Sequence, residues 1–251
     1  MSHPIFFHQL FIRNQVRIAL LAAGLLGACA QAMEFEYRAP GTIPQQSSAV
    51  PAKAVTPLQK GQLVMSGRVE GNEFRHLKDW LEKYPDIDTI VLKNSPGGDA
   101  ATGYTIGEYI REKGLTTAAA GYCLSSCSRM YLGGKKRYFS DELPAESTLV
   151  GFHGNYNNEG TLINTGRLKS WIMKYFNWNE EQRKRFEPLV DQWVNTSNRR
   201  GFMYFFDEQR YKIDGNSSVM YCTGSESRQE RLALCEKKKD ISSREIGVIL
   251  D

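Results

Sequence analysis

The stretch Thr89-Ile90-Val91-Leu92 and the turn Asn94-Ser95-Pro96-Gly97-Gly98 that follows it decide the fold predicted for this chain. The apolar half is continuous rather than alternating, which is typical of a strand buried within a parallel sheet. Proline and two glycines then end the strand in a turn whose backbone N–H groups can point outward. Such groups can hold a developing oxyanion. The stretch therefore predicts a buried parallel strand that ends in an oxyanion-binding turn.

A second stretch, Gly121-Tyr122-Cys123-Leu124-Ser125-Ser126-Cys127, places a serine at the start of a predicted helix. Together the two stretches resemble the Clp protease proteolytic subunit and its relatives in the ClpP/crotonase superfamily. In that family a strand ends in the same Asn-Ser-Pro-Gly-Gly turn, and a Gly-x-x-x-Ser stretch opens the helix that carries the nucleophile. The resemblance is clear from about Gln62 to Gly154, and it implies that Ser125 is the nucleophile. It also implies an α/β fold of ClpP/crotonase-like stacked ββα units, with a mostly parallel sheet flanked by helices.

The family's general base is a histidine shortly after a strand that follows an arginine-containing hairpin. This chain has Lys136-Arg137-Tyr138-Phe139 and then Ser147-Thr148-Leu149-Val150-Gly151-Phe152-His153-Gly154, so the base maps to His153. His76 is the other histidine outside the first eight residues, and it lies among charged residues on the polar side of a predicted helix. An ordinary helix cap for Ser125 and an ordinary packed imidazole for His153 are the structural alternatives.

The resemblance also implies an aspartate that orients the imidazole, and here the chain departs from the family. When the family pattern is aligned with Asn198-Arg199-Arg200-Gly201-Phe202-Met203-Tyr204, no acidic residue falls at the position of the aspartate. Asp191 lies two turns earlier on the predicted helix. Because an amide can serve as orienter, Asn198 is the predicted third residue. Either residue could instead be a solvated helix residue. The predicted oxyanion donors are the backbone N–H groups of Gly98 and Ser126.

These residues predict acyl transfer, and the resemblance implies a peptide bond as the target. The leading hypothesis is an exported serine hydrolase of peptides or proteins. The missing aspartate motivates a second one, a catalytically silent envelope protein that binds a peptide or partner along a sheet edge. A third is a crotonase-type thioester enzyme, which export away from coenzyme A disfavours. No metal site or cofactor is predicted, since Cys123-x-x-x-Cys127 lacks a second ligand pair and no glycine-rich lysine motif for phosphate occurs.

The amino-terminal segment is predicted to be a secretory signal over residues 1–32. It has two arginines, no acidic residue, and an apolar run from Ile18 to Ala28 that is too short to span a bilayer. Ala30-Gln31-Ala32 suits a signal peptidase, whereas Leu26-Gly27-Ala28-Cys29 resembles a lipobox that would attach Cys29 to the membrane. Both readings stay open. The predicted location is periplasmic or envelope-associated.

The charge balance speaks against a nucleic-acid partner. The chain has 32 lysine and arginine residues and 28 acidic residues. Because Arg13 and Arg17 lie in the predicted signal, the mature chain would carry a net charge of only about +2. Family members that work with an ATP-driven unfoldase form stacked rings, so a homo-oligomer is an open possibility. No ATPase partner is expected, since an exported protein would lack ATP.

Four cysteines remain beyond the predicted signal, an even number in a chain bound for an oxidising compartment. Three pairings are possible. The favoured one joins Cys222 with Cys235, which closes a short carboxy-terminal loop, and Cys123 with Cys127, beside the predicted nucleophile. Four free buried thiols are the alternative.

Residues 33–60 are predicted to be a proline-rich linker, and residues 61–251 a ClpP-like domain with a carboxy-terminal extension. Gly103 and Gly107 are predicted to let a helix approach the sheet closely. Apolar spacing predicts helices over Ala100 to Lys113, Ser126 to Leu132, Ile163 to Tyr175 and Asn179 to Ser197, and strands over Gln62 to Val69, Thr116 to Gly121 and Ser218 to Tyr221.

Overall fold

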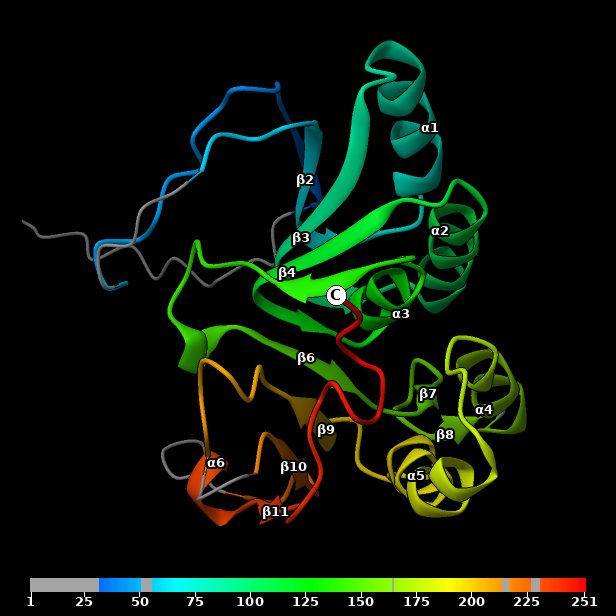
Figure 1. Ribbon diagram of the computed structural model, residues 1–251. Helices are drawn as coiled ribbons and strands as arrows, with labels where there is room; N and C mark the ends of the chain where they lie inside the picture. The colour runs from blue at the N-terminus through cyan, green and yellow to red at the C-terminus, as the bar shows by residue number, and fades with distance from the viewer. Residues whose placement is uncertain (1–31, 51–55, 164, 214–216, 227–230) are drawn as a thin grey trace, which may run out of the picture.

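A computed structural model describes residues 32–50, 56–163, 165–213, 217–226 and 231–251 (Figure 1). Nearly all of the predicted signal, including Cys29, lies outside these residues. None of the helices in the described ranges is long and apolar enough to cross a bilayer.

Nine strands of the described chain form one mixed sheet, in the order β1-β2-β3-β4-β6-β9-β10-β11, with β5 paired to β4. The strands of this sheet are β1 Glu34–Arg38, β2 Gly61–Val69, β3 Ile87–Gly98, β4 Thr116–Leu124, β5 Arg137–Phe139, β6 Leu149–Phe152, β9 Phe202–Phe205, β10 Val219–Cys222 and β11 Glu236–Lys237. A separate hairpin consists of β7, Asn155–Tyr156, and β8, Leu162–Ile163. The predicted α/β class is therefore confirmed.

The helices alternate with the central strands. They are α1 Glu73–Lys83, α2 Ala100–Glu112, α3 Ser126–Leu132, α4 Thr165–Met173, α5 Glu180–Val194 and α6 Arg231–Leu234, with one 3-10 turn, η1 Ala145–Ser147. Because α1 connects β2 to β3 and α2 connects β3 to β4, each crossover returns the chain in the same direction, and these pairs are parallel. Figure 1 shows α1, α2 and α3 on the same side of these strands.

The sheet is parallel only at its centre. Strand β1 adds to one edge in antiparallel orientation, and β9, β10 and β11 extend the other edge as an antiparallel meander. The predicted mostly parallel sheet thus describes β2, β3, β4, β5 and β6 but not the edges.

The predicted linker contributes a strand to the sheet. Although its prolines favour an extended tether, Phe35 and Tyr37 alternate with charged residues and pack against the core, which is the two-residue period of a half-buried strand. Arg38 then forms a buried ion pair with Glu142, with 2.7 Å between Nη1 and Oε1. Folded structure therefore begins before Gly61, where the sequence predicted it would begin.

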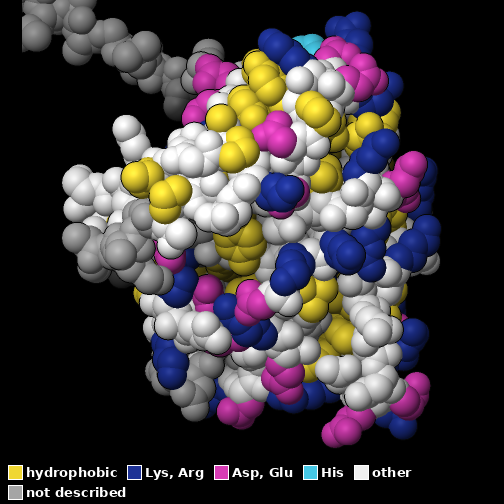
Figure 2. All heavy atoms as spheres, turned by 45° about the horizontal axis from the view of Figure 1, so that its top comes forward, with side chains coloured by type: hydrophobic (Ala, Val, Ile, Leu, Met, Phe, Trp, Pro, Cys, Tyr) yellow, Lys and Arg dark blue, Asp and Glu magenta, His cyan; other side chains and the backbone are white. Residues whose placement is uncertain are grey.

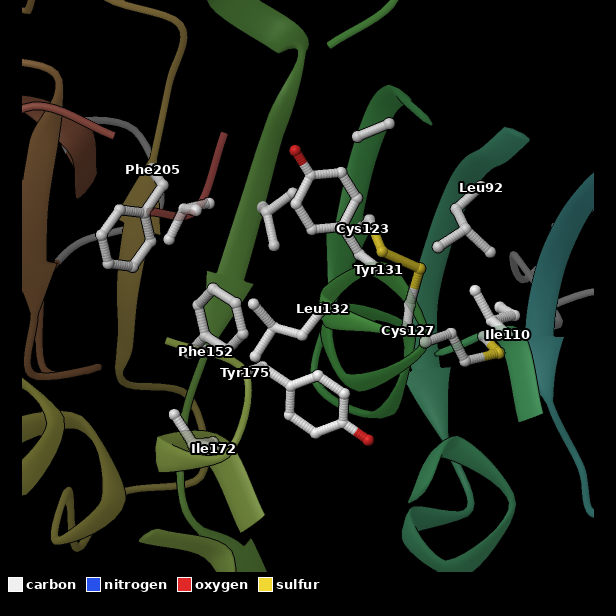
Figure 3. Close-up of a cluster of buried hydrophobic side chains, with 14 of the residues drawn as sticks. Leu92, Ile110, Cys123, Cys127, Tyr131, Leu132, Phe152, Ile172, Tyr175 and Phe205 are labelled. Carbon is white, nitrogen blue, oxygen red and sulfur yellow. A yellow bond between two sulfur atoms is a disulfide. The ribbon is translucent and has the colours of Figure 1, made fainter. Parts of the chain in front are cut away.

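The main core lies between the sheet and the helices. Figure 3 shows part of it, with the disulfide between Cys123 and Cys127 among buried apolar side chains. The glycines of α2 do not approach the sheet as predicted. A Cβ at Gly103 would lie 2.6 Å from the backbone oxygen of Ser126, so these glycines let α2 pack closely against α3 instead. This contact holds the start of α3 in place.

The carboxy-terminal segment is held by a buried arginine. The side chain of Arg137 is fully buried and donates hydrogen bonds to the carbonyl oxygens of Leu132, Gly134, Gly247 and Val248, at 2.5 to 3.2 Å. Two of these oxygens end helix α3 and two belong to the tail, so one guanidinium joins both segments. Burial lowers the pKa of Arg137 to about 10, which still leaves it charged at neutral pH.

We expect Arg137→Met to lower the free energy of unfolding by about 3 kcal/mol or more, because it leaves buried carbonyl groups unpaired. Urea unfolding measures this change. The neighbouring Lys136 is exposed, so Lys136→Met should change stability by no more than about 0.5 kcal/mol. Equal losses in the two variants would contradict this role of the guanidinium.

Candidate active site

Ser125 lies in a strained turn between β4 and α3. Its backbone has φ 57° and ψ −122°, a conformation that side-chain-bearing residues rarely adopt and that costs about 1–3 kcal/mol. The turn is fixed from both sides, since Ser125 N–H donates to the Gly151 carbonyl and Ser128 N–H donates to the Ser125 carbonyl, each at 3.0 Å. Such strain persists only where the surroundings impose the geometry.

The Cys123–Cys127 disulfide brackets the same turn, with its Cα atoms 5.3 Å apart. The second disulfide joins Cys222 with Cys235, so the favoured cysteine pairing is confirmed. Because Cys123 ends up in β4 and Cys127 in α3, the first disulfide ties the strand to the helix across Ser125. Disulfides of this kind fit a compartment outside the reducing cytoplasm.

Ser125 and His153 meet at the end of two adjacent parallel strands. Strand β4 pairs with β6, and Leu124 stands opposite Gly151, so the residues that follow both strands emerge at one edge of the sheet. The Oγ atom of Ser125 lies 2.7 Å from Nε2 of His153. The ring of Phe202 stacks on the imidazole at 4.3 Å between centroids, which restricts its orientation.

The imidazole is held in an environment that opposes protonation. Burial, followed by the positive charge of Arg129, lowers the pKa of His153 to about 3, while the backbone carbonyl of Arg199 acts in the opposite direction. Among the described residues, no group makes a well-formed hydrogen bond to Nδ1 of His153. The imidazole is therefore neutral at physiological pH and can accept a proton at Nε2.

The predicted third residue does not reach the imidazole. Asn198 lies in the turn after α5, and its Oδ1 accepts a hydrogen bond from the backbone N–H of Arg200 at 3.0 Å. Asp191 faces away from the site and forms an ion pair with Lys169 at 2.6 Å. A short amide side chain in a tight turn bonds readily to the backbone two residues on, which is the physical reason Asn198 is unavailable to His153.

Strand β3 continues through the predicted turn to Gly98, and near its end Gly97 packs directly against Ser125 and Ser126. A Cβ at Gly97 would lie 2.7 Å from the Cβ of Ser125 and 2.9 Å from the backbone nitrogen of Ser126, and one at Gly98 would collide with the Val69 carbonyl. Both glycines have positive φ values, 80° and 151°. Gly97 thus lies against Ser125 and Ser126, whereas a Cβ at Gly98 would meet only atoms of Val69, so the oxyanion role of Gly98 and Ser126 stays a prediction. The buried Ser126 hydroxyl has no hydrogen-bond partner within the described chain.

Sequence reasoning missed one residue of the site, Arg129. It is only 3% exposed, stacks on the ring of Tyr104 at 4.8 Å, and donates from Nη2 to Oδ1 of Asn155 at 2.5 Å. Its Nη1 atom is buried with no partner in the part of the chain that the structure describes. A signal was present, because Arg129 is the one charged residue in the otherwise apolar and small sequence of α3.

A cavity of about 520 Å³ lies near the Ser–His pair, with Tyr156 in its wall between the two. It is lined by the first two turns of α2, by α4 and by the β7–β8 hairpin, which Figure 1 places beside α4. Tyr156 lines it and lies 5.1 Å from the His153 ring between centroids. Across the described residues, no group of three or more His, Cys, Asp or Glu side chains could hold a metal ion.

No protein-family model and no curated protein matches this sequence. Solved structures similar to the chain include a mutant of the membrane-bound stomatin-specific protease 1510-N, with 12% identity over 53% of this chain and 67% of that one, at a TM-score of 0.37. A mutant of ClpP1 from Listeria monocytogenes has 17% identity, covers 57% of this chain and 81% of its own, and gives a TM-score of 0.32.

A third match is a proposed enoyl-CoA hydratase from Streptomyces avermitilis. It has 15% identity and a TM-score of 0.35, and the match spans 58% of this chain and 60% of the hydratase. The matches are thus of the kinds that the sequence resemblance implied. At these TM-scores they carry no inference about activity, and the function proposed below rests on this chain's own atoms.

We expect Gly97→Ala to lower the free energy of unfolding by about 2 kcal/mol or more, because the added methyl group meets Ser125 and the backbone has a positive φ. A matched control is Gly166→Ala in α4, where a Cβ would meet nothing within 4 Å. There the change should leave stability unchanged or raise it by up to about 1 kcal/mol. Urea unfolding of both variants tests the contrast, and two changes of the same sign and size would contradict it.

Proposed function

We propose that this protein is an exported serine hydrolase that cleaves peptide bonds through an acyl-enzyme on Ser125. The observation that carries the proposal is the 2.7 Å contact between the Ser125 hydroxyl and Nε2 of a neutral imidazole. A serine hydroxyl becomes a useful nucleophile only when a base within hydrogen-bond reach takes its proton. The strained backbone of Ser125 adds support, since strain of this kind gathers at functional sites.

The proposed reaction has two halves. The Ser125 oxygen attacks the substrate carbonyl while Nε2 of His153 takes the hydroxyl proton, and the imidazolium then gives that proton to the leaving amine. The backbone N–H groups of Gly98 and Ser126 would stabilise the oxyanion, and Ser126 stands at the positive end of a helix. Water, deprotonated by His153, would then hydrolyse the ester and restore Ser125.

The proposed substrate is a peptide or protein, and the two disulfides support action outside the cytoplasm. Basic and acidic side chains are interspersed on the face of the molecule in Figure 2, without one broad field of a single sign. Export itself, and attachment through Cys29, depend on residues outside the described chain.

A second candidate is a catalytically silent protein that binds a peptide or partner without cleaving it. One observation favours it: within the described residues no carboxylate orients His153, and no group makes a well-formed hydrogen bond to its Nδ1. In serine hydrolases an acidic residue at this position fixes the tautomer and stabilises the imidazolium. This candidate predicts that an active-site probe leaves Ser125 unlabelled.

We expect a fluorophosphonate probe to label the protein at Ser125, as detected by mass spectrometry of the modified peptide. Ser125→Ala should abolish labelling, and His153→Gln should slow it by about 1000-fold or more. Two matched controls are the exposed Ser147, as Ser147→Ala, and the helix residue His76, as His76→Gln, neither of which should change the rate. Labelling that survives Ser125→Ala would refute the proposal, and wild-type protein that stays unlabelled would favour the silent candidate.

The pH dependence of labelling is a further prediction. Because burial lowers the pKa of His153 to about 3, the rate should stay on its plateau down to about pH 5, where an imidazole with an ordinary pKa would be only about 3% neutral. Stability changes in the same window, since the unfolded chain binds this proton below about pH 6.5 and the folded chain binds it only near pH 3. Unfolding therefore becomes easier as pH falls, and circular dichroism defines the range in which the protein stays folded. A rate that halves near pH 6.5 would contradict the prediction.

A further inference from the structure

The cavity beside the Ser–His pair is in reach of any substrate bound at Ser125. Its lining includes Ala100, two residues after the end of β3 at Gly98, and Tyr156, whose ring centroid lies 5.1 Å from that of His153. A peptide whose carbonyl lies at Ser125 would therefore extend a neighbouring residue into this cavity. The chemistry of the cavity walls then determines which residue fits.

Two exposed cations line the cavity without an anionic partner. Arg167 stands on α4 and Lys174 directly follows its last residue, and in the described part of the chain neither takes part in an ion pair. The lining also includes one carboxylate, that of Glu108, which accepts a hydrogen bond from the Trp171 indole at 3.1 Å. The charge of the lining is thus positive by one unit.

A third cation lies beneath the wall. Arg129 packs under Tyr104 and Asn155, both of which line the cavity, and its Nη1 atom is buried without a partner in the described residues. The nearest acidic influence comes from Asp99, but its Oδ1 caps helix α2 by accepting from Thr102 N–H at 2.7 Å. A buried cation without an ion-pair partner is costly, and a nearby anion offsets that cost.

We propose that this cavity selects substrates through a carboxylate, which binds between the exposed side chains of Arg167 and Lys174 and the wall above Arg129. The proposal deepens the function proposed above and rests on it, since the ligand is the acidic residue or the carboxy-terminus of a peptide presented to Ser125. Charge complementarity carries it: two cations line the cavity and a third lies beneath its wall, whereas the one carboxylate of the lining, that of Glu108, accepts a hydrogen bond from Trp171. Arg167, Lys174 and Arg129 are the specificity-determining residues.

Substrate binding would also act on the base. The charge of Arg129 lowers the pKa of His153, so an anion beside Arg129 opposes that effect and makes the imidazole a better proton acceptor. The site lacks an aspartate beside the imidazole, and its cations would bind an anion that the substrate brings. A substrate carboxylate would supply the negative charge that the chain does not place near His153.

The test measures binding, so that it does not depend on acyl transfer. The full chain with Ser125→Ala is titrated into fluorescein-labelled alanine–leucine heptapeptides, and fluorescence anisotropy reports the dissociation constants. One glutamate is moved through every position, each peptide has a glutamine counterpart, and each is made with a free and an amidated carboxy-terminus. The last pair separates a side-chain carboxylate from a terminal one.

We expect at least one acidic peptide, through its side chain or its terminus, to bind about tenfold more tightly than its neutral counterpart, and the preference to weaken as salt is raised. Lys174→Gln and Arg167→Gln, each combined with Ser125→Ala, should reduce the preference. Lys184→Gln on α5 is the matched control, because Lys184 is exposed and does not line the cavity, and it should leave the preference intact. Arg129→Gln should abolish it in protein that circular dichroism shows to be folded.

Equal affinities for acidic and neutral peptides, or no binding of any peptide, would overturn the inference. A preference that Lys184→Gln reduces as much as Lys174→Gln would also overturn it, since the effect would then be one of overall charge. Failure of the proposed function gives a different pattern, in which acidic peptides still bind preferentially but the wild-type protein is not labelled at Ser125. If Ser125 is labelled but acidic peptides are not preferred, the proposed hydrolase is supported and only the proposed carboxylate site is refuted.

Discussion

The parallel pairing of β4 with β6 is the constraint on which the site depends. Two parallel neighbours end at the same edge of a sheet, so the residue after each strand emerges beside the other. One strand delivers Ser125 and the other His153, and neither needs to move for the hydroxyl to reach the imidazole. The Gly97–Gly98 turn belongs to the next strand, β3, and completes the same edge. A shift of the β6 register would separate the pair even if every residue were kept.

Packing around this edge keeps a strained turn in place. The backbone of Ser125 is in a conformation that glycine would adopt more easily, so its surroundings must impose it. The Cys123–Cys127 disulfide, the hydrogen bond to Gly151 and the close approach of Gly97 all act on the same few atoms. Packing of the core thus offsets the backbone strain at Ser125, the residue where chemistry is proposed. Arg137 contributes from a distance by joining the end of α3 to the tail.

Electrostatics distinguishes this site from a complete triad. His153 is buried beside a cation rather than beside a carboxylate, so its environment favours the neutral imidazole and disfavours the imidazolium. A neutral base is ready to accept a proton, but the charged state that follows gains no stabilising anion from the described chain. This is the physical reason that a substrate carboxylate matters in the proposal, and also the reason that a silent binding role remains the alternative.

Much of the architecture could be predicted from local patterns. The strand over Thr89 to Leu92 and the helix that follows depend on residue types a few positions apart, and both were predicted. The predicted turn from Asn94 to Gly98 does not end the strand, because β3 continues through it to Gly98 with positive φ at both glycines. The strand at Glu34–Arg38 was not predicted, because it shows only a short alternation of apolar and charged residues and the prolines that follow favour an extended linker. The site was predicted in part: Ser125 and His153 lie in contact, whereas Asn198 does not reach the imidazole.

The sequence by itself determined the central strands, most of the helices and which cysteines were best placed to pair, because backbone preference and short loop closure act over a few residues. Only the tertiary structure decided what stands behind His153 and what lies beneath the cavity. Those outcomes depend on the register of strands far apart in the chain and on where a long side chain finds room. Arg129 shows this most clearly: its sequence position marks it as unusual, but only packing buries it without an ion-pair partner.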